Sequence, residues 1–192
     1  MSGILSACAS WQGGKTCAAW ETVPSFFAQG QQLAAFETVV RANGYEGKGI
    51  LQIRRLAPSQ YQITAFTLAG GYRLLEADVT EKHIRYSFLI KQADRAQVRA
   101  GLRRLWVLLL FQPTAAGECK STDTGKVHLY KHPYPVQYLF AHTRQQPVAA
   151  QYKTFLQEAT LEYVHYAQPQ IPDKLLYRDG PVEMSLQLIR NR

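Results

Sequence analysis

The spacing of hydrophobic residues switches from a strand pattern to a helix pattern in one segment of this sequence, and this segment constrains the fold more than any other feature. Up to about residue 90, apolar and polar residues alternate in short segments, as in β-strands with one buried face. From Val98 to Leu109, apolar residues instead recur at steps of three and four, which indicates an amphipathic helix. Strand patterns then return. The sequence therefore predicts a mainly β fold of the α+β class, with one helix inserted into an antiparallel meander.

The expected strands are short and are joined by recognisable turns. Asn43-Gly44 and Gly70-Gly71 favour tight connections. Segment 148–157 fits either a strand or a short helix. The clearest alternation places Ile84, Tyr86, Phe88 and Ile90 on one face of a strand. We expect strands over 33–42, 49–56, 61–68, 72–79 and 83–90 before the helix, and over 126–132, 136–143, 160–167 and 182–188 after it.

The predicted helix has two different halves. Its basic residues Arg95, Arg99 and Arg103 are four apart and share one face, where they either contact phosphates or simply face solvent. Its second half, 106–111, is apolar on all sides, so we expect protein or a hydrophobic ligand to surround it. Pro113 disfavours continuation of the helix.

The length of the chain limits the number of domains, and its net charge limits the kinds of partner. A chain of 192 residues fits a single domain. Residues 1–31, rich in Ser, Ala, Gly and Gln, are expected to form a tether, and residues 32–192 the domain. A net charge of +8 favours anionic partners such as a phospholipid surface. Because the basic residues form no nucleic-acid-binding motif, we do not expect a nucleic-acid partner.

The tetrapeptide Leu5-Ser6-Ala7-Cys8 resembles a bacterial lipobox. In such a motif the cysteine is acylated and becomes the new N-terminus, so Cys8 is the expected lipidation site and membrane anchor. A signal peptide needs a basic region and roughly 7–15 apolar residues before this point. Only residues 1–4 precede the motif, so we expect the natural start to lie upstream. The alternative is a chance match in a tail that carries no lipid.

The remaining two cysteines are Cys17 and Cys119. In an oxidising compartment such as the periplasm an even number of cysteines permits one disulfide. Two free thiols are equally consistent with the sequence.

The order of these features resembles the LolA/LolB lipoprotein-carrier superfamily. The resemblance is carried by segments 49–54 (GILQIR), 61–67 (YQITAFT) and 68–76 (LAGGYRLLE), together with the lipobox-like start. More closely, the chain resembles a family of bacterial outer-membrane lipoproteins of unknown function found beside aryl polyene biosynthesis genes.

This resemblance implies an incomplete β-barrel that is wrapped around the helix and encloses an apolar cavity for acyl chains. The same side chains can instead fill a core. Ala9 after Cys8 implies delivery to the outer membrane, with the domain facing the periplasm. The Pro-Leu-Gly hairpin of LolB is replaced by Leu68-Ala69-Gly70-Gly71, which puts a lipoprotein-insertion role in doubt. The residues expected to line the cavity are Phe66, Phe88, Leu102, Trp106, Leu109, Phe111 and Phe140.

No catalytic, metal or cofactor motif stands out. His128 and His132 have the helical spacing of zinc ligands but lie in a predicted strand, where their backbones would be about 13 Å apart. We expect them to be surface or hydrogen-bonded histidines. The sequence lacks a Gly-x-Ser-x-Gly elbow, an H-E-x-x-H motif and a phosphate-binding glycine loop. We therefore expect no metal and no cofactor.

The expected function is non-enzymatic: a lipid-anchored outer-membrane lipoprotein that binds or transfers a lipid, lipoprotein or polyene-type molecule. A first alternative is an assembly module that docks an envelope protein partner. A second is an acyl-ester hydrolase, which needs a Ser or Cys within hydrogen-bond reach of a His.

Overall fold

A computed structural model describes residues 15–16, 32–111, 118–123, 125–130, 134–141, 146–155, 157–168 and 171–189. In this part of the chain, thirteen strands form one sheet, and one α-helix lies against it. All pairings between neighbouring strands are antiparallel. The predicted fold class, a curved antiparallel sheet around one helix, is confirmed.

The first half of the sheet is a meander of five strands in sequence order. Asn43 and Gly44 both have positive φ, at 50° and 82°, as a tight hairpin turn between the first two of these strands requires. The strands are β2 (Leu33–Ala42), β3 (Tyr45–Ala57), β4 (Gln60–Thr67), β5 (Arg73–Thr80) and β6 (Ile84–Leu89).

The second half of the sheet follows helix α1 (Ala96–Leu110). The short strand β1 (Lys15–Thr16), within the predicted tether, pairs with β7 at the outer edge. At the other end of this half, β13 pairs with β2 and joins the two halves. The strands are β7 (Glu118–Thr122), β8 (Gly125–Tyr130), β9 (Val136–Ala141), β10 (Pro147–Lys153), β11 (Glu158–Gln168), β12 (Ile171–Asp179) and β13 (Val182–Leu188).

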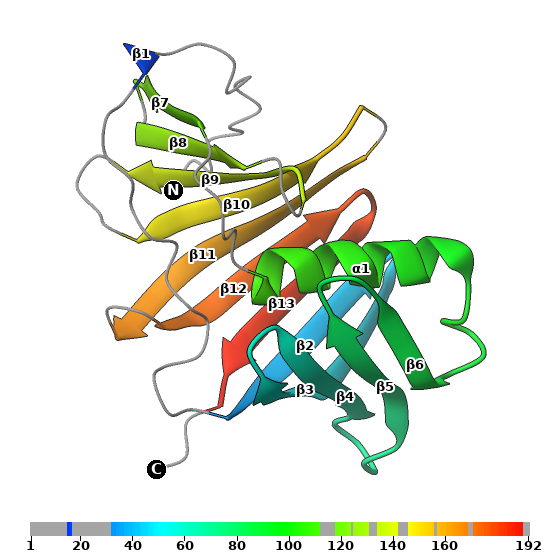
Figure 1. Ribbon diagram of the computed structural model, residues 1–192. Helices are drawn as coiled ribbons and strands as arrows, with labels where there is room; N and C mark the ends of the chain where they lie inside the picture. The colour runs from blue at the N-terminus through cyan, green and yellow to red at the C-terminus, as the bar shows by residue number, and fades with distance from the viewer. Residues whose placement is uncertain are drawn as a thin grey trace.

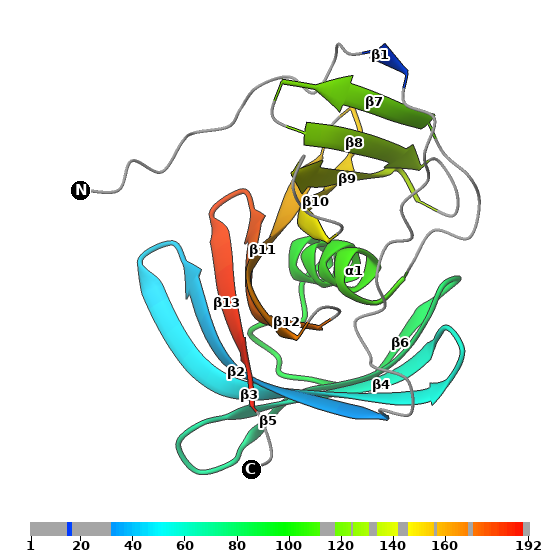
Figure 2. The same cartoon turned by 90° about the vertical axis from the view of Figure 1, so that its left-hand side faces the viewer.

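The sheet is strongly curved, and α1 lies on its concave side (Figure 1). Figure 2 shows α1 within the curve, with β7 to β10 on one side of it and β2 to β6 on the other. The core forms where the inward-facing strand residues meet the helix. Its members include Phe36, Ile53, Ile63, Val79, Tyr138, Leu161 and Leu186.

Hydrogen bonds to the backbone of α1 fix the helix against both halves of the sheet. Tyr61 on β4 donates its hydroxyl proton to the Leu110 carbonyl oxygen at 3.1 Å, at a helix end that leaves carbonyls without intrahelical partners. The Tyr177 hydroxyl on β12 lies 3.0 Å from the Gly101 carbonyl oxygen. These two contacts therefore fix the position of the helix along its own axis relative to the sheet, in addition to the packing of its buried face.

The predicted helix and the strand over 33–42 are confirmed, and residues 148–153 of the ambiguous segment lie in strand β10. Strands β1, β7 and β12 were not predicted from the sequence. Within the described residues, no helix is long and apolar enough to cross a membrane.

Candidate functional site

The predicted cavity-lining residues of α1 lie at the centre of the fold. Six successive residues, 105–110, are buried, so the second half of the helix is enclosed on all sides, as its sequence indicates. Trp106 is 1% exposed. Leu109 and Phe111 are also buried, and Leu102 is partly buried against the same core.

Phe140 is the predicted cavity residue from the second half of the sheet, and it is fully buried on β9. Its ring lies 4.7 Å from the ring of His128, measured between centroids. His128 was expected to be either at the surface or hydrogen-bonded, and because it is buried the surface alternative is wrong for this residue. His132 lies outside the described residues.

Two predicted cavity residues do not face α1. On β4 the inward-facing residues are Tyr61, Ile63 and Ala65, which leaves Phe66 on the opposite face. Phe88 is 40% exposed, and the Arg73 guanidinium lies over its ring at 5.9 Å. The assignment of both residues to the cavity was wrong.

A β-bulge explains the position of Phe88. Glu76 pairs with Phe88, whereas Ala77 pairs with Tyr86, so Ser87 is an extra residue in β6. The extra residue reverses the alternation along the strand. Tyr86 still faces the core, but Leu89 follows it there in place of Phe88.

Two of the pockets bounded wholly by described residues lie beside α1. One, of about 10 Å³, is lined by Thr80, His83, Ile84, Arg103, Val107, Phe111 and Tyr134. The other, of about 70 Å³, is lined by Ala100, Arg103, Arg104, Val107, Tyr152 and Gln157. The first is at the lower limit for a single water, and sites for drug-sized ligands are roughly 300–1,000 Å³. Neither pocket accommodates an acyl chain by itself.

The core beside α1 also contains polar atoms without partners. Among the described residues, the Trp106 Nε1 and Tyr86 hydroxyl groups are buried and form no hydrogen bond. Such groups are uncommon in folded proteins because each loses its bonds to water. Burial raises the pKa of Tyr86, and the positive charges of Arg99 and Arg103 partly offset this effect.

The three basic residues predicted on one face of α1 are all exposed. Arg99 donates from Nε to Asp94 Oδ1 at 2.7 Å, and its guanidinium lies 5.0 Å from the Tyr86 ring centroid. The hydrogen bond from Arg99 lowers the pKa of Asp94. Arg95 immediately precedes the helix, whereas Arg103 lines both pockets. Of these three basic residues, Arg103 is therefore the one that lines the two pockets beside α1.

An ion pair that the sequence analysis missed lies next to Arg103. Arg104 donates to Asp179 Oδ2 from Nε at 3.0 Å and from Nη2 at 2.8 Å. The two side chains are 13% and 15% exposed. The residues are far apart in sequence, and no local pattern indicates their pairing.

Cys119 is disulfide-bonded in the structure, so it is not a free thiol and does not supply a nucleophile. Cys8 and Cys17, the other two cysteines, lie outside the described residues. Among the histidines, His165 pairs through Nδ1 with Asp173 Oδ1 at 2.6 Å on an exposed part of β11. Within the described residues, no three His, Cys, Asp or Glu side chains gather as metal ligands would.

No protein-family model matches the sequence, and no curated protein matches it. Solved structures do match. A LolA superfamily protein from Nitrosomonas europaea superposes with a TM-score of 0.53 and 12% identity, over 84% of this chain and 86% of that chain.

Two further structures have lower TM-scores. A candidate outer membrane lipoprotein-sorting protein domain from Vibrio parahaemolyticus gives 0.48, at 7% identity and 84% coverage of each chain. A DUF1329 family protein from Desulfovibrio piger gives 0.46, at 8% identity over 84% of this chain and 85% of that chain. The similarity to the first of the three structures shows that this chain shares the fold of a LolA superfamily protein.

Proposed function

We propose that this chain is a non-enzymatic, periplasm-facing outer-membrane lipoprotein, and that its half-barrel binds or transfers a hydrophobic, acyl-bearing molecule. The observation that carries the proposal is the enclosed second half of α1 on the concave side of an open sheet. Because this half of the helix is apolar on all sides, it can exchange contacts with the sheet for contacts with a hydrocarbon chain. Each buried methylene would then contribute about 0.8 kcal/mol.

The fold supports this proposal because it is the fold of a LolA superfamily protein. Binding of this kind needs apolar surface and a route of entry, and no catalytic group. The Trp106 Nε1 on the helix and the Tyr86 hydroxyl on β6 are buried without hydrogen bonds, which supports a core that is not optimised for packing alone.

Fatty-acid binding tests the proposal directly. We expect purified protein to bind cis-parinaric acid with saturable fluorescence. Replacing Ala100, which lines the 70 Å³ pocket beside α1, with Phe should fill this pocket and weaken binding. Ala96→Phe, at the exposed first residue of the same helix, is the matched control and should bind normally. Absence of binding by the unmodified protein would contradict the proposal.

The membrane anchor needs a separate test in cells. When the gene is expressed from its natural start, palmitate labelling should mark the protein, and Cys8→Ala should abolish both the label and its recovery with outer membranes. An unlabelled wild-type protein would remove the anchor from the proposal and leave acyl binding to the preceding test.

A further inference from the structure

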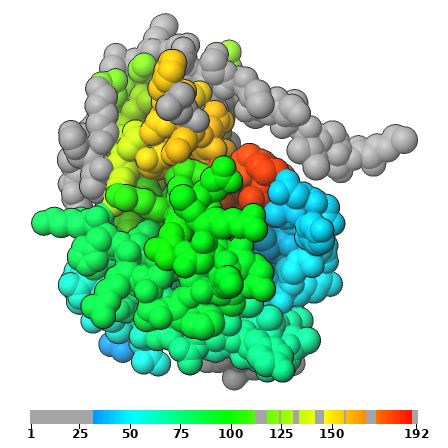
Figure 3. All heavy atoms as spheres, turned by 90° about the vertical axis from the view of Figure 1, so that its right-hand side faces the viewer, coloured from blue at the N-terminus to red at the C-terminus, as the bar shows by residue number. Residues whose placement is uncertain are grey.

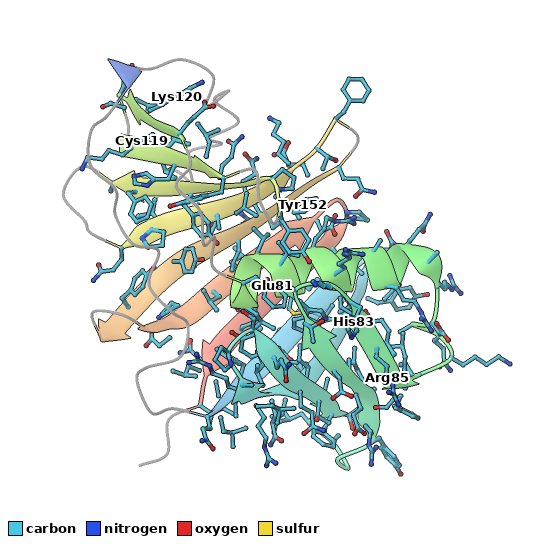
Figure 4. All side chains as sticks on the ribbon, viewed as in Figure 1. Glu81, His83, Arg85, Cys119, Lys120 and Tyr152 are labelled. Carbon is cyan, nitrogen blue, oxygen red and sulfur yellow. The ribbon has the colours of Figure 1, made fainter. Side chains whose placement is uncertain are left out.

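The pocket of about 70 Å³ lies between the middle of α1 and the end of the β10–β11 hairpin. Tyr152 extends from β10 toward α1 (Figure 4). In Figure 3 the residues of α1, in green, lie at the surface between this hairpin, in yellow to orange, and strands β2 and β3, in blue. A ligand can therefore reach this part of the helix from solvent.

The positive charge of Arg104 in this pocket is already neutralised. Both Nε and Nη2 donate to Asp179, and Nη1 donates to Gln157 Oε1 at 2.9 Å. Arg104 therefore forms part of the pocket wall and leaves little capacity for a further anion.

Arg103 is in a different state. Within the part of the chain that the structure describes, its guanidinium forms no hydrogen bond and no ion pair, and no Asp or Glu lines the pocket. The Tyr152 hydroxyl and the Gln157 amide nitrogen donate to no described group either. One cation that is not neutralised and two neutral donors thus line a small pocket whose described lining includes no carboxylate.

The remaining walls are apolar. Ala100 and Val107 complete the lining of this pocket. Val107 also lines the smaller pocket, together with Ile84 and Phe111. Arg103 lies at the boundary between them. A charged group bound to Arg103 would therefore have hydrocarbon surface directly beside it.

We propose that Arg103, Tyr152 and Gln157 form a subsite for the oxyanion headgroup of a single-chain amphiphile, a carboxylate or a phosphate. The inference rests on the proposed acyl binding and names the class of ligand. A guanidinium matches the geometry of both oxyanions, and charge-assisted hydrogen bonds are the stronger ones. The pocket, of about 70 Å³, is large enough for one such group.

Calorimetric titration with three ligands of equal chain length tests the subsite: dodecanoate, dodecyl phosphate and dodecanol, each as monomers. We expect both anions to bind roughly tenfold or more tightly than dodecanol, from hydrogen bonds to charged groups. Arg103→Gln should remove this preference and leave dodecanol binding unchanged. Arg85→Gln, which removes an exposed cation on β6 that lines neither pocket, should retain it.

The outcomes separate the subsite from the proposed function. Equal binding of all three ligands by the unmodified protein overturns the subsite but leaves acyl binding intact, as does an unchanged anion preference in Arg103→Gln. Absence of binding for all three overturns both. Inorganic phosphate alone should bind far more weakly than dodecyl phosphate, and equal affinity would overturn the assignment to an amphiphile. Because Arg103 is exposed, its variant should fold, which circular dichroism checks.

Discussion

Arg104 and Asp179 join the middle of α1 to the end of β12 through two hydrogen bonds that share one carboxylate oxygen. The Tyr177 hydroxyl lies 2.9 Å from the same oxygen and 3.0 Å from the Gly101 carbonyl oxygen, so its single proton serves one of them at a time. This cluster fixes the first half of the helix, where few apolar residues are buried.

Asp179→Asn should therefore destabilise the protein. The substitution leaves the Arg104 guanidinium mostly buried without a counterion, and we expect a loss of roughly 3 kcal/mol in the free energy of unfolding. Urea denaturation measures it. Glu46→Gln breaks the exposed pair with Arg41, 2.9 Å long, and should have a much smaller effect. Similar losses in the two variants would show that burial of the Arg104 pair is unimportant.

Two glycines of β3 offer a test of how closely β3 and β4 pack. A Cβ added at Gly49 would collide with the Phe66 carbonyl oxygen, whereas one added at Gly47 meets nothing within 4 Å. Gly49→Ala should therefore cost roughly 1–3 kcal/mol of stability through backbone displacement. Gly47→Ala changes the same residue type in the same strand and should be close to neutral. Equal thermal midpoints for the two variants would contradict the close approach.

The buried tyrosines predict loss of stability at alkaline pH. Burial raises the pKa of Tyr138 and of Tyr177 above the ordinary value of 10.0, and the carboxylate of Asp179 contributes at Tyr177. Below pH 10 both states keep these protons, and the stability is fully present. Above pH 10 the unfolded chain releases them while the folded chain holds them, so stability falls, by up to about 1.4 kcal/mol per pH unit for each group.

Tyrosinate absorbance and circular dichroism, recorded in the same alkaline titration, check this prediction. The last tyrosines should ionise only as the protein unfolds. Complete tyrosine ionisation with an intact circular dichroism spectrum would show that these two hydroxyls are accessible in the folded state.

The register between β1 and β7 suggests a partner for Cys119 that peptide mapping can test. Lys15 pairs with Ser121 and Thr16 with Lys120, and an extension of this pairing by one residue would bring Cys17 opposite Cys119. Directly opposed residues on neighbouring strands have the Cα separation that a disulfide needs. Peptide mapping without reduction should join Cys17 to Cys119, and Cys8→Ser should preserve the bond. A peptide that joins Cys8 to Cys119 would contradict this pairing.

Sequence periodicity predicted the parts of the fold in which one residue in two is buried. The strand over 33–42 follows directly from it, because its buried residues Ala34, Phe36 and Thr38 are two apart. The helix follows instead from apolar residues at steps of three and four, although its second half is buried on all sides. Strands β7 and β12 lack this signal. Only Cys119 is buried on β7, and β12 contains Pro172 and the adjacent pair Leu175-Leu176, which breaks the alternation.

The candidate site was harder to predict than the fold. A single extra residue, Ser87, turned Phe88 away from the helix, and local sequence does not indicate where a bulge will form. The difference between Arg103 and Arg104 depends on Asp179, which is distant in the sequence. Composition and spacing therefore identified the basic residues of the helix but could not show which of them was already neutralised.

The pairing of β13 with β2 brings the two ends of the domain together. Leu188 lies opposite Phe36, and the Ile189 amide donates to the Ala35 carbonyl oxygen at 2.8 Å. The start of β2 and the end of β13 are therefore neighbours in the middle of the sheet, close enough for a short link to join them. A circular permutant that joins residue 189 to residue 33 and opens the chain between α1 and β7 would keep every pairing from β2 to β6 and from β7 to β13. It would also turn the most sequence-distant strand contact into a local one, and low contact order favours fast folding.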